Sequence, residues 1–288
     1  LRYRASELDG LIDAINASGY GLTMGVHTRI DETVERVAAR AHVGNLYVNR
    51  NIIGAVVGVQ PFGGEGLSGT GPKAGGPNYL WRFVRPAAVP GRGALPASLP
   101  DALGQRLRAL QALLPDQSGL LAQAAPRLLG QALPGPTGER NELRLHPRGH
   151  VVGLLSEEGW RAGLGLALLA GNRVTLVGSQ AALAGACALV QALQGGVLDG
   201  RLACQVHEPS QWAEWLPKAA LDGVFGAGLS AAQTATVLAA LAARSGAIVP
   251  LVLPDEAAQP QQIYRFAAEQ TLTVNTAAAG GNAALLAG

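Results

Sequence analysis

The chain has 288 residues, a length that suits two modest domains or one large domain. Its 22 Lys and Arg residues nearly balance its 20 Asp and Glu residues, and a net charge of +2 argues against a surface built for nucleic acid or an anionic membrane. Hydrophobic residues make up 48% of the chain, which excludes global disorder. Few aromatic residues and 39 glycines favour helices packed closely on a parallel sheet over a β-sandwich.

The cysteine count and the apolar runs indicate a reducing, aqueous setting. Cys187 and Cys204 are too few for a disulfide framework. The longest apolar run, residues 162–171, is half the length of a membrane-spanning helix, which needs about 20 residues. We therefore expect a cytoplasmic location. Residue 1 is Leu rather than Met, so we also expect a fragment of a longer chain.

The first 85 residues predict a compact α/β arrangement. One helix is expected to be capped by Ser6 and a second by Asp31. Strands are predicted at residues 22–27 and 46–48. The Gly-rich segment 51–77 is too long for an idle connection, which is typical of a functional loop.

The remainder predicts a second domain. Residues 86–100 are rich in proline and indicate a linker. Apolar helical patterns follow, interrupted at Pro115, Pro126 and Pro134. Strands and helices then alternate, which predicts a doubly wound parallel sheet. The predicted strands are residues 151–155, 173–177, 202–206, 223–225 and 248–253, and the predicted helices are residues 163–170, 181–193 and 231–243.

One long motif resembles a known family. Residues 44–82 read GNLYVNRNIIGAVVGVQPFGGEGLSGTGPKAGGPNYLWR. This stretch resembles the C-terminal part of the catalytic half of an aldehyde dehydrogenase. The resemblance is closest to L-glutamate γ-semialdehyde dehydrogenases, especially the module found in bifunctional proline utilization A proteins. The tail QTLTVNTAAAGGNAALL is similar to the C-terminal motif of the longer members.

The resemblance implies an α/β fold and divides the chain into four consecutive segments. The end of an aldehyde dehydrogenase catalytic domain (1–85) precedes the linker (86–100). A degenerate Rossmann-like, doubly wound domain without a cofactor site follows (101–270), and the chain ends in a C-terminal docking motif (271–288). We expect Thr271–Gly288 to dock across the first domain as an added strand.

Gly54 and Ala55 are the candidate substrate-binding residues. Consecutive small residues let backbone N–H groups converge on an anion. The family uses this position as a loop that anchors the substrate carboxylate, and the resemblance carries that role to these two residues. Phe62, presented by a Gly-rich turn, implies a ring that packs on the aliphatic part of the substrate. The alternatives are a tight turn without a ligand and a core phenylalanine.

Residues 64–69 spell G-x-G-x-x-G, but their context argues against a dinucleotide site. That fingerprint must follow a strand and open a helix. Here Pro61 precedes the motif, and Pro72 follows it and blocks a helix. We expect a packing role for these glycines.

The chemistry of the family requires groups that this sequence does not offer. An aldehyde dehydrogenase needs a thiolate nucleophile, a general base and a bound nicotinamide. Cys187 and Cys204 lie in a buried helix pattern and in a strand, so we expect structural core cysteines. Cys204 and His207 form C-x-x-H without further ligands, so no metal site is expected. The resemblance places the catalytic Cys and Glu upstream of Leu1, so no catalytic residue is assigned here and the segment alone is expected to be inactive.

The second domain opens like an aldehyde dehydrogenase cofactor domain and then departs from it. Residues 156–160 replace a stretch whose Asn serves the oxyanion, and Val177 replaces the Lys that binds the cofactor ribose. We therefore assign no cofactor-binding residue to this segment. A genuine but unusual nucleotide site remains an alternative.

The resemblance implies NAD-dependent oxidation of L-glutamate γ-semialdehyde to L-glutamate, with NAD bound mainly by upstream residues. It also implies FAD in an upstream proline dehydrogenase domain, which would make the protein peripheral to the inner membrane. The expected partners are the semialdehyde, the upstream part of the same enzyme and further copies in a homo-oligomer, with no nucleic acid contact. The non-catalytic domain is expected to aid assembly and substrate channelling. The rival hypothesis is a stand-alone, non-enzymatic interaction module.

Overall fold

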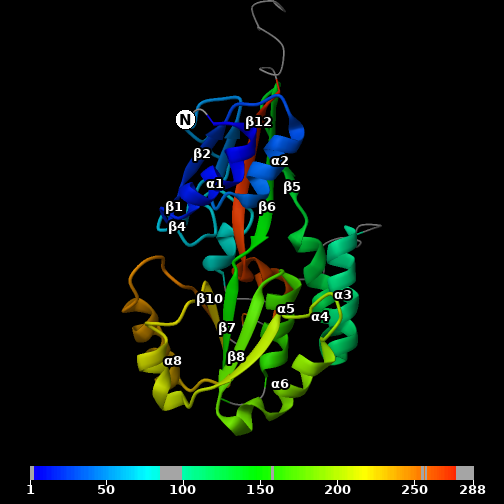
Figure 1. Ribbon diagram of the computed structural model, residues 1–288, viewed down its shortest axis with the longest axis vertical. Helices are drawn as coiled ribbons and strands as arrows, with labels where there is room; N and C mark the ends of the chain where they lie inside the picture. The colour runs from blue at the N-terminus through cyan, green and yellow to red at the C-terminus, as the bar shows by residue number, and fades with distance from the viewer. Residues whose placement is uncertain (1–2, 85–98, 157–158, 254–255, 257, 277–288) are drawn as a thin grey trace, which may run out of the picture. The chain divides into compact units, whose positions relative to one another are not determined.

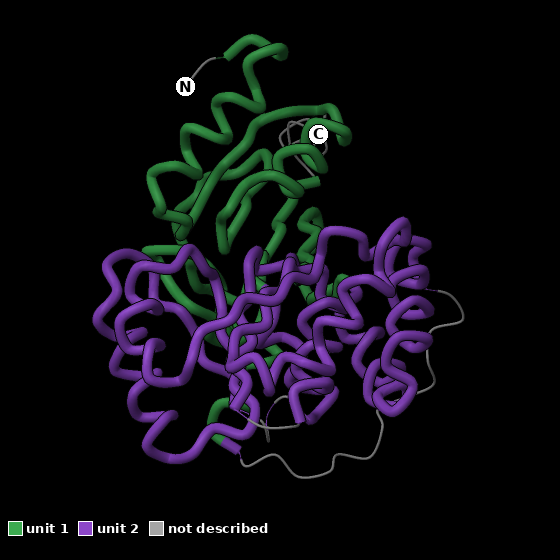
Figure 2. The backbone as a smooth tube through the Cα atoms, turned by 60° about the horizontal axis from the view of Figure 1, so that its bottom comes forward, with its two compact units in different colours: residues 1–83, 130–145, 268–288 green, residues 84–129, 146–267 purple. Residues whose placement is uncertain are grey.

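The computed structural model describes residues 3–84, 99–156, 159–253, 256 and 258–276. The chain divides into two compact units (Figure 2). Unit 1 comprises Leu1–Phe83, Gly130–Leu145 and Ala268–Gly288, and unit 2 comprises Val84–Leu129 and His146–Ala267. Unit 1 is thus assembled from three stretches that are far apart in the sequence.

The sheet of unit 1 has five strands in the order β2-β3-β12-β6-β5 (Figure 1). Its strands are β2 (Thr23–Val26), β3 (Asn45–Val48), β12 (Ala267–Asn275), β6 (Glu139–Pro147) and β5 (Gln131–Leu133). Strand β3 is parallel to both β2 and β12, whereas β5 and β6 are antiparallel. A separate two-stranded sheet pairs β1 (Tyr20–Gly21) with β4 (Glu65–Gly66).

Two helices of unit 1, α1 (Leu8–Asn16) and α2 (Asp31–Arg40), pack their apolar faces into one hydrophobic cluster. Leu8 and Ile12 of α1 meet Val34 and Val37 of α2 there, and Leu272 of β12 belongs to the same cluster. Both predicted helices are therefore present, and their buried residues recur at the three- and four-residue spacing of one helix face.

The predicted helix caps are wrong. Ser6 lies inside a 3₁₀ turn, η1 (Ala5–Glu7), and the first residue outside α1 is Glu7, whose side chain makes no capping bond. The carboxylate of Glu7 instead accepts the Arg4 amide N–H at 3.1 Å. Asp31 is the first residue of α2 and not its cap. A second 3₁₀ turn, η2 (Tyr79–Arg82), ends the N-terminal stretch.

One boundary of the expected domain order differs from the structure, and one expected contact is present. Residues 130–145 were assigned to the second domain, but they supply β5 and most of β6 to unit 1. The tail enters the same unit, because Thr271–Val274 pair in parallel with Asn45–Val48. The expected added strand is therefore present in the described part of the tail. Residues 277–288 and most of the expected linker lie outside the described residues.

The sheet of unit 2 confirms the predicted doubly wound fold. Its five strands run in the order β11-β10-β7-β8-β9, and every neighbouring pair is parallel. Numbered along the chain within this sheet, that is the 3-2-1-4-5 order of a Rossmann-type sheet. The strands are β7 (His150–Leu155), β8 (Arg173–Gly178), β9 (Leu202–Val206), β10 (Gly223–Ala227) and β11 (Leu251–Val252).

The helices of unit 2 follow the predicted alternation, and 3₁₀ turns begin where prolines interrupt it. The α-helices are α3 (Asp101–Leu113), α4 (Ser118–Ala124), α5 (Trp160–Leu169), α6 (Gln180–Ala192), α7 (Trp212–Trp215) and α8 (Ala231–Ala242). The 3₁₀ turns are η3 (Pro115–Gln117), η4 (Ala125–Leu128), η5 (Pro209–Gln211) and η6 (Pro260–Phe266). No helix in the described ranges is long and apolar enough to cross a membrane.

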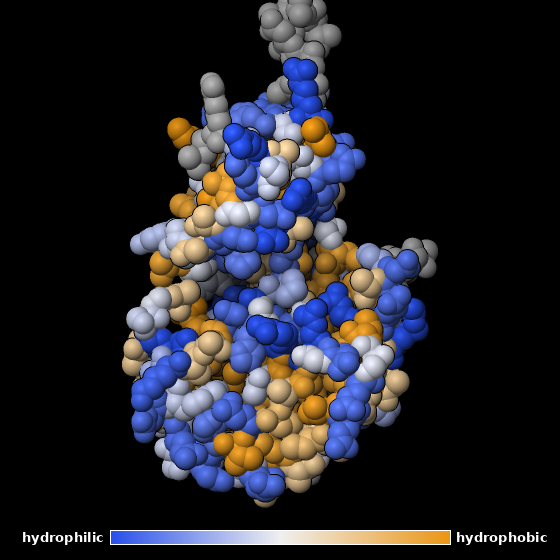
Figure 3. Space-filling model, in the orientation of Figure 1, coloured by the Kyte–Doolittle hydropathy of each residue, from blue (hydrophilic) through white to orange (hydrophobic). Residues whose placement is uncertain are grey.

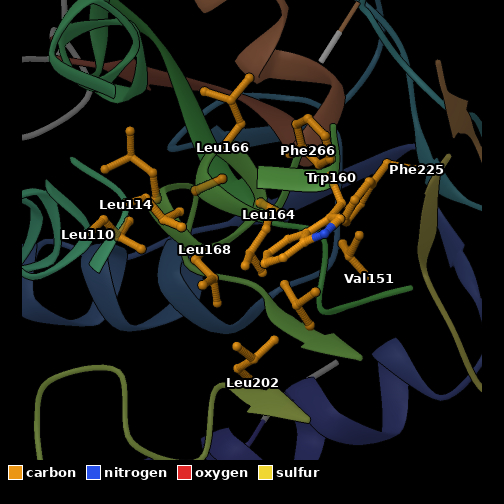
Figure 4. Packing of buried hydrophobic residues seen from close by; sticks show 14 of the residues in the cluster. Leu110, Leu114, Val151, Trp160, Leu164, Leu166, Leu168, Leu202, Phe225 and Phe266 are labelled. Atoms are coloured by element: carbon orange, nitrogen blue, oxygen red, sulfur yellow. The ribbon is translucent and has the colours of Figure 1, made fainter. Parts of the chain in front are cut away.

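Helix α5 forms the centre of the main core (Figure 4). Leu164, Leu166 and Leu168 are fully buried, so the helix is apolar on all sides. The rings of Phe225 and Phe266 meet edge to face in this cluster, with their centroids 6.1 Å apart. This all-round burial explains why the longest apolar run of the sequence falls on α5.

Candidate substrate-binding site

The loop that follows β3 presents two free backbone amides. Gly54 is exposed and adopts a left-handed conformation with φ 81°, and Ala55 is half-buried. Within the described part of the chain, the N–H groups of Gly54 and Ala55 donate no hydrogen bond. The amides on either side are occupied, since Ile53 N–H donates to its neighbour Asn51 and Val56 N–H to a buried glutamine. The loop therefore offers a pair of adjacent donors to an anion.

That buried glutamine is Gln60, and its side chain connects the loop backbone to strand β6. Its Oε1 accepts the Val56 N–H at 2.9 Å, and its Nε2 donates to Glu139 Oε1 at 2.5 Å. Arg50, at the start of the loop, makes an ion pair of 2.6 Å with Glu139 Oε2. The same guanidinium lies over the ring of Tyr47, 5.0 Å from its centroid. Both ends of the loop are thereby tied to one carboxylate on β6.

Phe62 lies on the next turn and is 37% exposed, so it is not a fully buried core phenylalanine. Its backbone exchanges two hydrogen bonds of 3.0 Å with Ala74, which closes the Gly-rich loop into a hairpin-like bridge. The ring is presented at the surface of unit 1. Its contact with a substrate remains a prediction, as does the anion contact of Gly54 and Ala55.

Lys73 is a buried residue to which the sequence analysis gave no role. Its Nζ donates to Asn45 Oδ1 at 3.0 Å and to the carbonyl of Gly63 at 2.5 Å. Burial lowers the pKa of Lys73 to about 8, although the nearby carboxylates of Glu269 and Glu65 oppose that shift. The sequence signal that could have indicated this buried, hydrogen-bonded lysine is its place within a Gly-rich, apolar stretch.

The G-x-G-x-x-G segment has the packing role expected of it. Glu65 and Gly66 form β4 and open no helix. Ser68 Oγ accepts the Gly21 N–H at 3.1 Å, and a side chain at Gly66 would collide with the carbonyl of Gly19. These glycines permit close backbone approach between the two segments.

In unit 2, Val177 stands where the family has the lysine that binds the cofactor ribose, and its neighbours are apolar as well. Val177 is fully buried in β8 within a hydrophobic cluster, so this position directs no cation to a ribose. A cavity of about 510 Å³ lies where α5 and α6 begin. It is lined in part by Trp160 and by the Arg161–Asp116 ion pair, whose nearest atoms are 3.6 Å apart.

The two cysteines differ from the expected core positions. Cys187 is exposed on α6, and Cys204 is half-buried on β9. Helix α6 is rich in Ala on all sides, so its sequence carries no polar stripe to mark the outer face, and hydrophobic residues reach the surface around α6 in Figure 3. Burial and the neighbouring thiol of Cys187 raise the pKa of Cys204 to about 12, which disfavours a thiolate. Among the described residues, no three His, Cys, Asp or Glu side chains could hold a metal ion.

Comparison with known proteins agrees with the motif. Residues 2–89 match the aldehyde dehydrogenase family model. Over 99% of its length, the chain is 45% identical to the bifunctional protein PutA of Escherichia coli K12, and over its full length it is 41% identical to PutA of Rhizobium meliloti. The chain is similar to part of a bifunctional proline utilization A protein. It spans 22% and 23% of the length of these two relatives.

Two further similarities are narrower. A stretch of 77 residues, 27% of the chain, is 49% identical to 1-pyrroline-5-carboxylate dehydrogenase 2 of Bacillus subtilis and covers 15% of that protein. The structure of proline utilization A from Corynebacterium freiburgense superposes with a TM-score of 0.54 over 93% of the chain and 24% of that protein. At 22% identity, this second likeness supports the fold alone.

Proposed function

We propose that this chain supplies the substrate-carboxylate wall of an NAD-dependent dehydrogenase that oxidises L-glutamate γ-semialdehyde to L-glutamate within a longer bifunctional proline-catabolism protein. The free amide pair of Gly54 and Ala55 supports this proposal most directly, because it fits an anionic end group. The similarity to PutA proteins and to a 1-pyrroline-5-carboxylate dehydrogenase supports the choice of substrate.

The residues of this chain bind and orient the substrate in this proposal. Gly54 and Ala55 donate to the carboxylate, and the Phe62 ring packs on the aliphatic chain and keeps water from it. The thiol nucleophile, the general base and most contacts to NAD belong to residues outside these 288, so the segment alone is inactive. NAD, when bound there, accepts a hydride. FAD serves the proline dehydrogenase part of the protein.

The first test replaces Gly54 by Ala in a complete protein that contains this chain. The added Cβ meets open space, but the left-handed backbone at Gly54 strains any L side chain and turns the two amides away. We expect the KM for L-glutamate γ-semialdehyde to rise about tenfold, a loss of about 1.4 kcal/mol of binding. Oxidation of propanal, which has no carboxylate, is expected to be unchanged.

Gly200→Ala is the matched control, because Gly200 has a similar φ of 68° and equally open surroundings in unit 2. It is expected to leave both substrates unaffected. An equal rise in KM for propanal, or no rise for the semialdehyde, contradicts the proposed carboxylate anchor.

A further inference from the structure

Glu139 of β6 bonds the loop that carries Gly54 and Ala55 at both of its ends, through Arg50 and Gln60. One carboxylate oxygen pairs with Arg50 Nη1 at 2.6 Å, and the other accepts Gln60 Nε2 at 2.5 Å and Asn141 Nδ2 at 2.9 Å. Gln60 and Arg50 in turn contact the backbone of the loop. Gln60 Oε1 accepts the Val56 N–H at 2.9 Å, and Arg50 Nη2 lies 3.4 Å from the carbonyl oxygen of Gly54.

The same network extends to the strand contributed by the tail. Asn141 Oδ1 accepts the hydroxyl of Thr273 on β12 at 2.7 Å. Thr273 is fully buried, as is nearly all of Asn141. Side chains from β12, β6 and the loop thus form one continuous line of hydrogen bonds.

The burial of this network makes its geometry specific. The side chains of Arg50 and Glu139 retain only 19% and 14% of their exposure, and Gln60 is 2% exposed. A largely buried carboxylate whose two oxygens are both bonded has few alternative arrangements, because each alternative leaves a polar group unpaired. The network therefore restricts the loop to one conformation, in which the neighbouring amides are occupied and those of Gly54 and Ala55 are free.

We propose that Glu139 is a positioning residue for the substrate-carboxylate loop, acting through Gln60 and Arg50. This inference depends on the proposed function, since it assigns a second element to the same site. It also gives the β5–β6 hairpin a part in substrate affinity. Fixing the loop before binding removes an ordering cost from the binding step, so loss of the carboxylate weakens substrate binding more than it slows the reaction.

The test compares Glu139→Gln with Glu142→Gln in a complete protein that contains this chain. Glu142 lies on the same strand and pairs with Arg144, which keeps a second partner in Glu35. Within the described residues the Glu142 carboxylate makes no hydrogen bond or ion pair to the loop. For Glu139→Gln we expect the KM for L-glutamate γ-semialdehyde to rise about tenfold with kcat changed less than twofold, and propanal oxidation to be unaffected. Glu142→Gln is expected to match the unsubstituted protein.

Hydrogen exchange provides a readout that is independent of activity. In Glu139→Gln the neutral amide loses the ion pair with Arg50 and accepts the Gln60 hydrogen bond more weakly than a carboxylate does. The Val56 amide, which donates to Gln60, is therefore expected to exchange at least tenfold faster, while Val48 on β3 keeps its protection. If Glu139→Gln does not fold, Gln60→Met cuts the same connection with a side chain of similar length. It is expected to give the same carboxylate-selective rise in KM.

The outcomes separate the two proposals. If Gly54→Ala raises the KM for the semialdehyde and Glu139→Gln does not, the positioning role is wrong and the proposed function stands. If neither variant affects the carboxylated substrate selectively, the proposed function itself fails. If Glu139→Gln lowers kcat for both substrates equally and leaves Val56 exchange unchanged, Glu139 has a general structural role and the inference is overturned.

Discussion

Three segments of unit 1 meet at Lys73. Its ammonium group contacts Asn45 on β3 and the carbonyl of Gly63, while its backbone N–H donates to Glu269 on β12 at 2.5 Å. Glu269 also accepts Asn78 Nδ2 at 2.8 Å. The C-terminal half of the Gly-rich segment 51–77 is thus held by buried polar contacts, because few of its own side chains can pack a core.

The lowered pKa of Lys73 predicts a pH dependence of stability. Between pH 8 and 10.5 the unfolded chain keeps the proton that the folded chain has released, so the free energy of unfolding rises with pH over this window. The full difference is on the order of 3 kcal/mol. Lys73→Met is expected to remove this rise, as measured by urea unfolding at pH 8 and pH 10 relative to the unsubstituted protein.

Lys218→Met is the control for that experiment. Lys218 is exposed and pairs with the exposed Glu214 four residues earlier, so its substitution is expected to leave the rise of the unfolding free energy with pH unchanged. An equal rise of the unfolding free energy with pH in Lys73→Met and in the unsubstituted protein contradicts a lowered pKa of Lys73 in the folded chain.

At the scale of elements, two glycines set the distance between α5 and the sheet of unit 2. A Cβ at Gly163 on α5 would lie 2.6 Å from the ring of Phe225, and one at Gly153 on β7 would collide with the same ring. Phe225 is fully buried, so the ring has no free space into which to move. The helix packs closely because these positions carry no side chain.

Gly163→Ala is therefore expected to destabilise the fold despite the better helix propensity of alanine. Overpacking a tight core costs about 1–3 kcal/mol, which exceeds the gain of about 1 kcal/mol from the propensity. Gly185→Ala in α6 meets nothing within 4 Å and is expected to stabilise by up to that propensity gain. Thermal unfolding measures both, and a stabilised Gly163→Ala variant would show that the ring can move.

At the scale of the whole molecule, the tail enters unit 1 as a central strand. Strand β12 lies between β3 and β6 in the sheet order, and Gln270, Thr271 and Thr273 are buried. Removal of Thr271–Gly288 would take away half of that strand and unfold the sheet. Only a truncation that keeps β12 can test the proposed role in channelling.

Truncation after Thr276 keeps all of β12 (Ala267–Asn275). If the last residues enclose a passage between two active sites, conversion of proline to glutamate is expected to show a lag in the truncated protein. Oxidation of the added semialdehyde is expected to keep its rate. Stopped-flow measurement of NADH formation from proline distinguishes the two, and the absence of a lag argues against channelling through these residues.

The local pattern of the sequence was enough for unit 2 and for the choice of loop. Strand and helix periods between residues 151 and 253 reflect which side chains are buried, so β9 was predicted with its observed bounds, Leu202–Val206. The alternation of strands and helices also predicted a parallel sheet, whereas the order of its strands came from the structure. The motif around Gly54 and Phe62 selected the candidate site, and the structure shows both residues accessible.

Only the tertiary structure decided the membership of β6 and the support of the loop. Glu139 and Asn141 appear as surface residues in the sequence, because a buried polar side chain is stable only when its partners are present. Those partners, Gln60, Arg50 and Thr273, are about 80 to 130 residues away in the chain. Local periodicity carries no information about such distant partners, so the sequence determined the elements and the folded chain determined which of them meet.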